Sequence, residues 1–179
     1  MLNKCCDVKR FTEDLPEINI VKELEKANKK VDVDTFSGHK FGEIISNSEI
    51  SRDFKVDLIR GIRINKEENY CVIIADVNFK NKNNVYPDIF DLKDGLDKFT
   101  LYYVGEGKRN NQDIESPGNS FLKNSIIKNS DIYVFQYINV NEYQYSGKFV
   151  LKSISKAMQP DENGKLREVI LFKLKPKFI

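Results

Sequence analysis

The sequence predicts a mainly β (α+β) fold, a β-barrel flanked by a few helices. Three observations indicate this fold class: short apolar runs of strand length, turn signals between these runs, and few segments with helical periodicity. The length of 179 residues suits one domain that buries a substantial core. The chain has no internal repeat and no long linker, so we expect the barrel to account for most of it.

The N-terminal part of the chain predicts a helix. Pro16 suits a first helical turn, and Ile18, Val21 and Leu24 form one apolar stripe. The basic residues between positions 26 and 30 favour the C-terminal end of this helix, because cations stabilise the negative end of the helix dipole.

Apolar patterns predict five strands. Their ranges are 71–75, 101–104, 132–138, 143–151 and 169–174. Residues 71–75 form a continuous apolar run of strand length. Between 143 and 151 apolar and polar residues alternate, which predicts a strand with one face on the core.

Turn and cap residues set the limits of the later elements. Asn119 is predicted to cap a helix that runs through Lys128. Asn163 and Gly164 favour a hairpin turn between the last two strands. Pro176 ends the final strand, because proline cannot donate a hydrogen bond to a neighbouring strand.

Charge and composition exclude several classes of function. The net charge is only +2, so any nucleic-acid surface must be a local patch. The single histidine, His39, excludes an HNH nuclease centre, which needs one histidine as general base and another as metal ligand. The three cysteines lack metal-ligand spacing. We therefore expect no metal, no cofactor and no catalytic site in this chain.

The same composition predicts where the protein works. An odd number of cysteines favours a reducing compartment. No apolar run approaches the ~20 residues that a membrane helix needs, and the first residues lack the apolar core of a signal peptide. We expect a cytoplasmic protein with no membrane partner.

A Gly-x-Gly turn carries the most informative chemistry. In segment 102–109 two tyrosines lead into Gly105 and Gly107, and a Lys-Arg pair follows. Glycines let the backbone pass close to another molecule. Aromatic rings can stack on bases, and cations can contact phosphates. Taken alone, the segment also fits an ordinary strand, a tight turn and solvated charges.

Further motifs follow this turn in a fixed order. They are the Tyr-Val-Gly-Glu-Gly-Lys turn at 103–108, Gln112, the Gly-Asn-Ser-Phe-Leu helix start at 118–122, the Tyr-x-Tyr-x-Gly strand at 143–147, and an acidic glycine hairpin with an apolar strand at 161–174. Together they resemble the SRA-like domain of the PUA-like superfamily. The closest likeness is to the domain at the N-terminus of bacterial HNH modification-dependent restriction endonucleases.

The resemblance implies a domain division and a fold. It extends from about Gly38 to Leu174, so residues 38–179 are expected to form an SRA-like DNA-binding domain with a PUA/SRA-like β-barrel. Residues 1–37 lie outside the resemblance and are interpreted as an N-terminal helical extension.

The resemblance also implies a pocket for a base flipped out of the duplex. Tyr86 and Tyr103 would stack on the two faces of the base, and Asp88 would accept a hydrogen bond from a cytosine amino group. Asp91 and Asp94 compete with Asp88 for this role. Val104 replaces the family's threonine and could touch a 5-substituent. The alternative is that both tyrosines belong to the barrel core and Asp88 caps a turn.

Several polar residues are candidates for contacts to the DNA backbone. They are Arg60, Lys108, Arg109, Gln112 and Lys123. Lys108 and Arg109 are favoured by their position directly after the glycine turn. Solvated surface charges are the alternative for all the cations in this set.

The expected function is recognition rather than catalysis. We expect the chain to bind double-stranded DNA that contains 5-methyl- or 5-hydroxymethylcytosine, in a modification-dependent restriction or phage-defence system with a fused or separate nuclease domain. Three alternatives stay open: a PUA-like reader of RNA or N6-methyladenine, a metal-dependent nuclease that uses unrecognised carboxylates, and a protein-interaction module that has lost the pocket.

Overall fold

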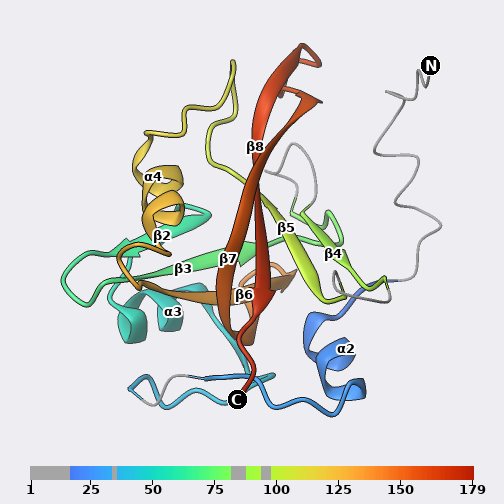
Figure 1. The fold of residues 1–179 in the computed structure, drawn as a ribbon. Helices are drawn as coiled ribbons and strands as arrows, with labels where there is room; N and C mark the ends of the chain where they lie inside the picture. Colours follow the sequence, from blue (N-terminus) through green and yellow to red (C-terminus); the bar gives the residue numbers. More distant parts are fainter. Residues whose placement is uncertain (1–16, 34–35, 82–87, 94–97) are drawn as a thin grey trace.

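A single curled sheet dominates the computed structural model, which describes residues 17–33, 36–81, 88–93 and 98–179 (Figure 1). The strands are β1 (Ile44–Ile45), β2 (Ile62–Asn65), β3 (Tyr70–Ala75), β4 (Ile89–Asp91), β5 (Thr100–Val104), β6 (Asp131–Asn139), β7 (Glu142–Pro160) and β8 (Leu166–Pro176). The helices are α2 (Ile20–Lys26), α3 (Asn47–Phe54) and α4 (Pro117–Asn124). The expected mainly β fold with few helices is confirmed.

The sheet order is β2-β3-β6-β7-β8-β5-β4, and β1 adds to β7. β3 and β6 pair in parallel, whereas the other strand pairs of the described residues are antiparallel. β7 and β8 form the long hairpin that rises through the centre of Figure 1. Its turn contains Gly164 at a φ of 80°, as the Asn-Gly pair predicts.

All five predicted strands are present, and most are longer than predicted. β7 continues to Pro160 because its second half pairs with β8 after the first half has paired with β6. β8 starts at Leu166 for the same reason. The alternating pattern ends near Leu151, since the outer half of β7 is largely exposed.

The prediction that α2 starts near Pro16 and buries Ile18 in its stripe is wrong. Asn19 is the N-cap of α2, and its side chain accepts a hydrogen bond from the Lys22 amide. Ile18 lies before this cap. Asn ranks among the strongest N-cap residues because its side chain satisfies an otherwise unpaired amide of the first turn.

The prediction that Asn119 caps a helix through Lys128 is also wrong. Ser116 is the N-cap residue of α4, and Pro117 occupies the first turn, the position where its missing N–H costs nothing. The helix ends at Asn124. Asn119 is therefore an internal helical residue, and its buried side chain is free to bind a neighbouring loop.

Two hydrophobic clusters cover the two faces of the sheet. In β3, Cys71 and Ile73 belong to one cluster, whereas Tyr70 and Val72 belong to the other. Successive side chains of a strand point to opposite faces, so these clusters lie on opposite sides. α2 and α4 pack into the first cluster, and α3 packs into the second.

The described part of the N-terminal extension shares the core of the main domain. Ile20 and Leu24 of α2 are both 0% exposed and belong to the same cluster as β5 and β8. Within the described ranges, no helix has the length and apolar character needed to cross a membrane.

Candidate functional site

Asp88 lies between the ends of β3 and β5, two strands near opposite ends of the sheet order. Its Oδ2 atom accepts a hydrogen bond of 2.9 Å from the Asp76 amide, directly after β3. Its Oδ1 atom accepts one of 2.9 Å from the Val104 amide, at the end of β5. The residue is 7% exposed. The Asp88 carboxylate thus joins two strands that are far apart in the sheet order, and we call Asp76, Asp88 and Val104 the Asp88 junction.

The junction has an unusual protonation equilibrium. The pKa of Asp88 is raised to about 7, mainly by burial and to a smaller extent by the nearby Asp76 carboxylate. The amides of Val104 and Asp76 act in the opposite direction, because they donate to the ionised form. Asp88 therefore changes charge near neutral pH, which is far above the usual range of an aspartate.

This equilibrium predicts a pH-dependent stability. Because the folded-state pKa is raised, Asp88 contributes stability that is complete below its unfolded pKa, near 4, and is lost as pH rises through about 7. We expect the free energy of unfolding to fall by on the order of 1–3 kcal/mol between pH 5 and pH 8 through this group. Urea unfolding at both pH values measures it. In Asp88→Asn this fall should disappear, and an equal fall in the variant would assign it to other groups.

Tyr103 spans from β5 to the start of β2 and is only 4% exposed. A Cβ atom at Gly61 would lie 2.8 Å from the Tyr103 hydroxyl oxygen, so only glycine leaves room for the phenol at this point. Burial raises the pKa of the Tyr103 phenol well above its ordinary value. The ring belongs to the core cluster beside the Asp88 junction.

The structure does not bring all predicted pocket residues together. Tyr86 and Asp94 lie outside the described residues. Asp91 is at the far end of β4, where its Oδ1 atom accepts from the Lys93 amide at 2.9 Å. Three residues of extended chain separate it from Asp88, which is about 10 Å. Asp88, Tyr103 and Val104 remain as neighbours.

The Gly-x-Gly turn opens a loop, 105–112, that is fastened to the domain itself. The Gly105 amide donates to the Ile170 carbonyl at 2.8 Å. A Cβ atom at Gly105 would lie 2.7 Å from Asn119 Oδ1. The close approach that this glycine permits is therefore to the chain's own α4 side chain.

Buried polar side chains organise this loop from within. Gln112 donates to the carbonyls of Gly105 and Gly107 and accepts from the Ile170 amide at 2.8 Å. Asn119 accepts from the Glu106 amide at 2.8 Å. Gln112 uses both ends of its amide inside the protein, so we remove it from the proposed backbone contacts.

Arg167 is a loop-organising residue that the sequence did not reveal by position. Its Nη1 atom donates to the Gly107 carbonyl at 2.7 Å and to the Asn110 carbonyl at 3.0 Å. The residue is buried at the start of β8. An arginine after a hairpin reads as a surface cation in the sequence, and only the fold places it under the loop.

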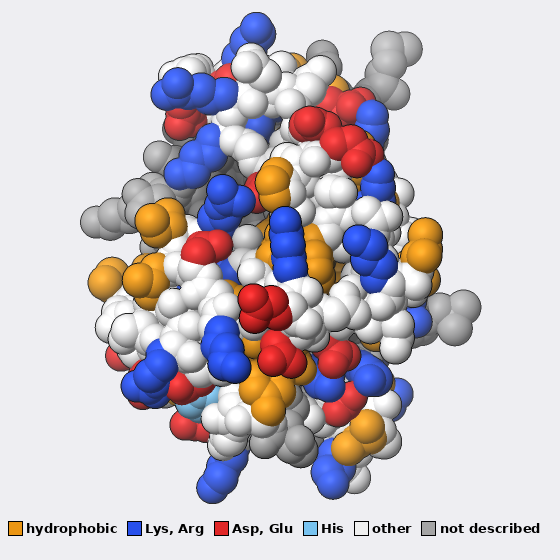
Figure 2. Space-filling view, turned by 90° about the vertical axis from the view of Figure 1, so that its left-hand side faces the viewer, with side chains coloured by type: hydrophobic (Ala, Val, Ile, Leu, Met, Phe, Trp, Pro, Cys, Tyr) orange, Lys and Arg blue, Asp and Glu red, His pale blue; other side chains and the backbone are white. Residues whose placement is uncertain are grey.

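The four predicted backbone cations are at least partly exposed. Arg109 pairs with Glu162, and Lys123 pairs with Glu115. Within the described part of the chain no carboxylate pairs with Arg60 or Lys108. On the face seen in Figure 2, Lys and Arg side chains are interspersed with Asp and Glu, in keeping with a net charge of +2.

An exposed isoleucine in the loop before β2 was missed by sequence reasoning. Ile59 is 93% exposed. The Asp57 side chain holds this loop by accepting from the Ile59 and Arg60 amides, both at 3.0 Å. Ile59 is two residues before Gly61, whose backbone lies close to the Tyr103 hydroxyl group.

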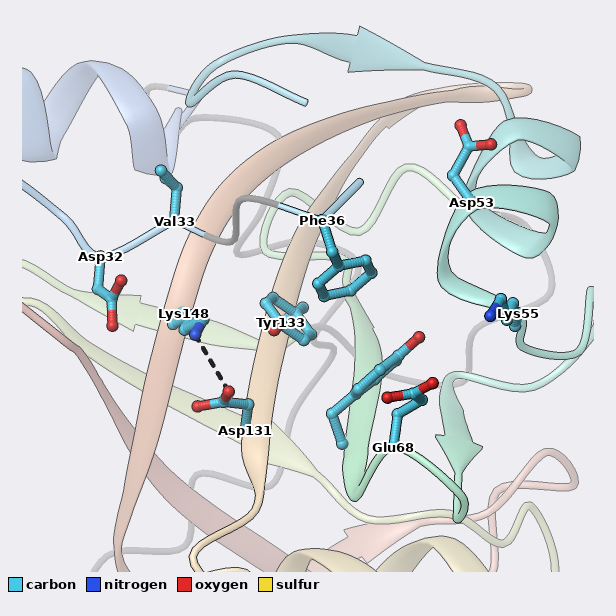
Figure 3. Close-up of a pocket in the computed structure, with 10 residues that line it drawn as sticks. Asp32, Val33, Phe36, Asp53, Lys55, Glu68, Asp131, Tyr133 and Lys148 are labelled. Carbon is cyan, nitrogen blue, oxygen red and sulfur yellow. Dashed lines mark hydrogen bonds and ion pairs between the residues drawn. The ribbon is translucent and has the colours of Figure 1, made fainter. Parts of the chain in front are cut away.

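A separate hollow of about 690 Å³ lies on the other face of the sheet, beside α3 (Figure 3). Phe36 stacks on Tyr70 there, with ring centroids 5.5 Å apart. Its charged rim is largely compensated within the protein: Lys148 pairs with Asp131 at 3.1 Å, as the dashed line in Figure 3 marks. The described residues hold no group of three or more potential metal ligands.

The comparisons with known proteins agree with this geometry. The model of the ScoMcrA-like SRA domain matches residues 41–177. The chain belongs to the ScoMcrA-like SRA domain family. A search of curated proteins finds no significant match to this SRA domain.

Solved SRA structures share its fold. The SUVH5 SRA domain in complex with hemimethylated CG DNA matches with a TM-score of 0.58 at 24% identity, over 80% of this chain and 91% of that one. The modification-dependent restriction endonuclease TagI matches with a TM-score of 0.57 at 19% identity, over 82% of this chain and 53% of TagI. ScoMcrA in complex with phosphorothioated DNA matches with a TM-score of 0.58 at 16% identity, over 77% of this chain and 40% of that one.

Proposed function

We propose that this SRA domain binds double-stranded DNA containing 5-methyl- or 5-hydroxymethylcytosine and reads the base after flipping it from the duplex. The Asp88 junction carries the proposal. Asp88 is a buried carboxylate, held by two backbone amides, beside a buried tyrosine. We propose that the SRA domain serves as the recognition module of a modification-dependent restriction or phage-defence system in the cytoplasm.

The chemistry of Asp88 favours cytosine over thymine. Each carboxylate oxygen accepts one backbone amide and keeps a further lone pair. An ionised carboxylate can therefore accept a hydrogen bond from the cytosine 4-amino group, whereas thymine presents an acceptor oxygen at the same position. Because the two amides fix its orientation, little side-chain entropy is lost when the base binds.

Ile59 fits a role at the duplex. Proteins that open a base step often insert an apolar side chain such as Ile into the stack. Ile59 is exposed and close in sequence to the Gly61–Tyr103 contact. We propose that it occupies the stack beside the flipped base.

The relatives support modified DNA as the ligand class. SUVH5 has been crystallised with hemimethylated and with fully hydroxymethylated CG DNA. ScoMcrA has been studied with phosphorothioated DNA, through a sulfur-binding domain together with its SRA domain. Phosphorothioated DNA is therefore the second candidate ligand, and a nuclease domain is the proposed partner, because TagI and ScoMcrA are restriction endonucleases.

A binding panel tests the proposal. Matched duplexes would carry cytosine, 5-methylcytosine, 5-hydroxymethylcytosine, N6-methyladenine or a phosphorothioate link, with RNA of the same sequence as control. We expect the tightest binding to one of the two modified cytosines. Equal affinity for all duplexes would reject modified-base reading, and a preference for RNA or N6-methyladenine would support a different PUA-like function.

Phosphate contacts should give binding a modest salt dependence. Each contact adds roughly 0.9 to the slope of log affinity against log salt. Replacing Lys108 and Arg109 by alanine should lower this slope and weaken binding to modified and plain duplexes alike. Fluorescence anisotropy at several salt concentrations measures both effects.

The control for this prediction removes the same charge elsewhere. Lys29 lies over the Phe178 ring, beyond the far end of β8 from loop 105–112. A double variant with alanine at Lys29 and Lys30 should keep the wild-type slope. If both double variants behave alike, loop 105–112 does not face DNA.

A further inference from the structure

Ile18 of the N-terminal segment has both its backbone N–H and its backbone carbonyl bonded to side chains of the main domain. The Ile18 amide donates to Asn78 Oδ1 at 2.9 Å, and Asn78 Nδ2 donates to the Ile18 carbonyl at 2.8 Å. Gln136 Nε2 also donates to the Ile18 carbonyl, at 2.7 Å. These bonds hold Ile18 as a neighbouring strand would, although it belongs to no strand.

Gln136 fixes the start of α2 in the same way. Its Oε1 atom accepts from the Ile20 amide at 2.7 Å, and its side chain is completely buried. Gln136 is the Cα partner of Ala75, the last residue of β3. The side-chain amides of Asn78 and Gln136 therefore hold segment 18–20 against the end of β3. We call these two residues the N-terminal clamp.

The clamp holds a turn that belongs to the Asp88 junction. Asn78 lies within the turn 76–81, which the Asp76 side chain closes by accepting from the Lys80 and Asn81 amides, both at 2.9 Å. The backbone amide of the same Asp76 donates to Asp88 Oδ2. The position of this donor thus depends on the turn, and the turn is fastened from outside by Asn78.

An ion pair at the surface reinforces the arrangement. Lys80 Nζ lies 2.9 Å from the Glu17 carboxylate, one residue before Ile18. This pair is exposed and contributes little by itself. It extends the contact between the segment and the turn from Asn78 to Lys80.

We propose that the N-terminal segment, which lies outside the matched SRA region, is a positioning element of the base-reading site and acts through Asn78 on the Asp76 donor of Asp88. The proposal rests on the function proposed above for Asp88. Asn78 is a positioning residue, because it contacts neither Asp88 nor the base directly. A ligand-reading role therefore depends on residues before position 41, where the family match begins.

NMR titration tests the positioning step without DNA. In the wild-type protein the amide signals of Asp76 and Val104 should both shift as Asp88 titrates, because each amide donates to one of its oxygens. In Asn78→Ala the response of the Asp76 amide should be lost or strongly reduced. The Val104 amide, which is held by β5, should keep its response and serves as the internal reference.

Two variants separate positioning from general destabilisation. Asn78→Asp keeps an acceptor for the Ile18 amide and should recover part of the Asp76 response. Gln144→Ala removes the 2.7 Å bond that Asn19 Nδ2 donates to Gln144 Oε1, together with the bond from Gln144 Nε2 to the Gly42 carbonyl. It therefore loosens the same segment at β7, two strands away from β3. This control should leave both amide responses unchanged. Wild-type responses in Asn78→Ala, or equal losses in Gln144→Ala, would overturn the proposal.

DNA binding gives the second readout. Asn78→Ala should weaken binding to the preferred modified duplex by about tenfold and leave plain duplex unchanged, because only base reading uses Asp88. If Asn78→Ala loses the NMR response of the Asp76 amide but binds modified DNA with full affinity, the clamp does position the Asp76 donor. The same result would contradict the role of Asp88 in base reading. The two failures are thereby distinguished.

Discussion

Asp88→Asn is expected to remove most of the preference for modified cytosine. The side-chain amide keeps the shape of the carboxylate but points an NH2 group toward one of the two backbone amides or toward the base. The loss should be about 1–3 kcal/mol, or roughly five- to 150-fold, on the preferred duplex. Plain duplex, held through its phosphates, should bind as before.

The matched control is Asp91→Asn. It is the same substitution three residues later, at the end of β4, where the Asp91 side chain accepts a hydrogen bond from the Lys93 amide. We expect it to leave both affinities within about twofold of the wild type. If Asp91→Asn loses modified-base preference and Asp88→Asn keeps it, the reading carboxylate has been placed at the wrong aspartate.

The pH dependence of binding follows from the same residue. A neutral carboxyl group accepts a hydrogen bond from the cytosine amino group less well than an ionised carboxylate does. With a pKa of about 7, Asp88 is mostly neutral at pH 6 and mostly ionised at pH 8. Affinity for the modified duplex should therefore rise over this range, in contrast to the stability of the free protein.

Tyr103→Ala is expected to cause the largest loss of stability among these variants. The ring is buried in the main core cluster and fills the space between β5 and Gly61. Truncation of a buried aromatic side chain to alanine costs about 3–5 kcal/mol. Chemical denaturation should show a lower midpoint with an unchanged slope if the variant still unfolds in two states.

Tyr103→Phe separates the role of the hydroxyl group from that of the ring. It keeps the ring and removes only the hydroxyl group beside Gly61. We expect stability within about 1.5 kcal/mol of the wild type and a retained preference for modified DNA. Normal stability with full loss of that preference would show that the hydroxyl, rather than the ring face, reads the base.

The strand pattern could be predicted because periodicity reports burial directly. The continuous run around Val72 and the pattern after Tyr143 both became strands. The predicted single core face of the second strand is wrong: Tyr145 and Phe149 belong to clusters on opposite faces of the sheet, because the register with β6 shifts between them. The family resemblance then supplied the barrel. The helix starts were less predictable, since Asn19 and Ser116 compete with neighbouring residues of similar cap propensity.

The candidate site could be predicted only in part, because its residues meet through long-range contacts. Asp88 and Val104 were identified from the resemblance, but nothing in the sequence pairs Asp88 with the Asp76 amide. Gln112 seemed suited to a phosphate contact because a polar side chain after a glycine turn is usually exposed. The fold instead buries it under that turn, where its side-chain amide bonds three backbone groups.

Base flipping into the Asp88 junction is tested most directly by 2-aminopurine fluorescence. The probe would be placed beside the modified cytosine in the duplex that binds most tightly. We expect the signal to rise on binding of the wild-type protein, because extrusion of the neighbouring base relieves stacking of the probe. Asp88→Asn should show little rise at equal occupancy. Saturated, modification-specific binding by the wild type with no change in fluorescence would contradict base flipping at this site.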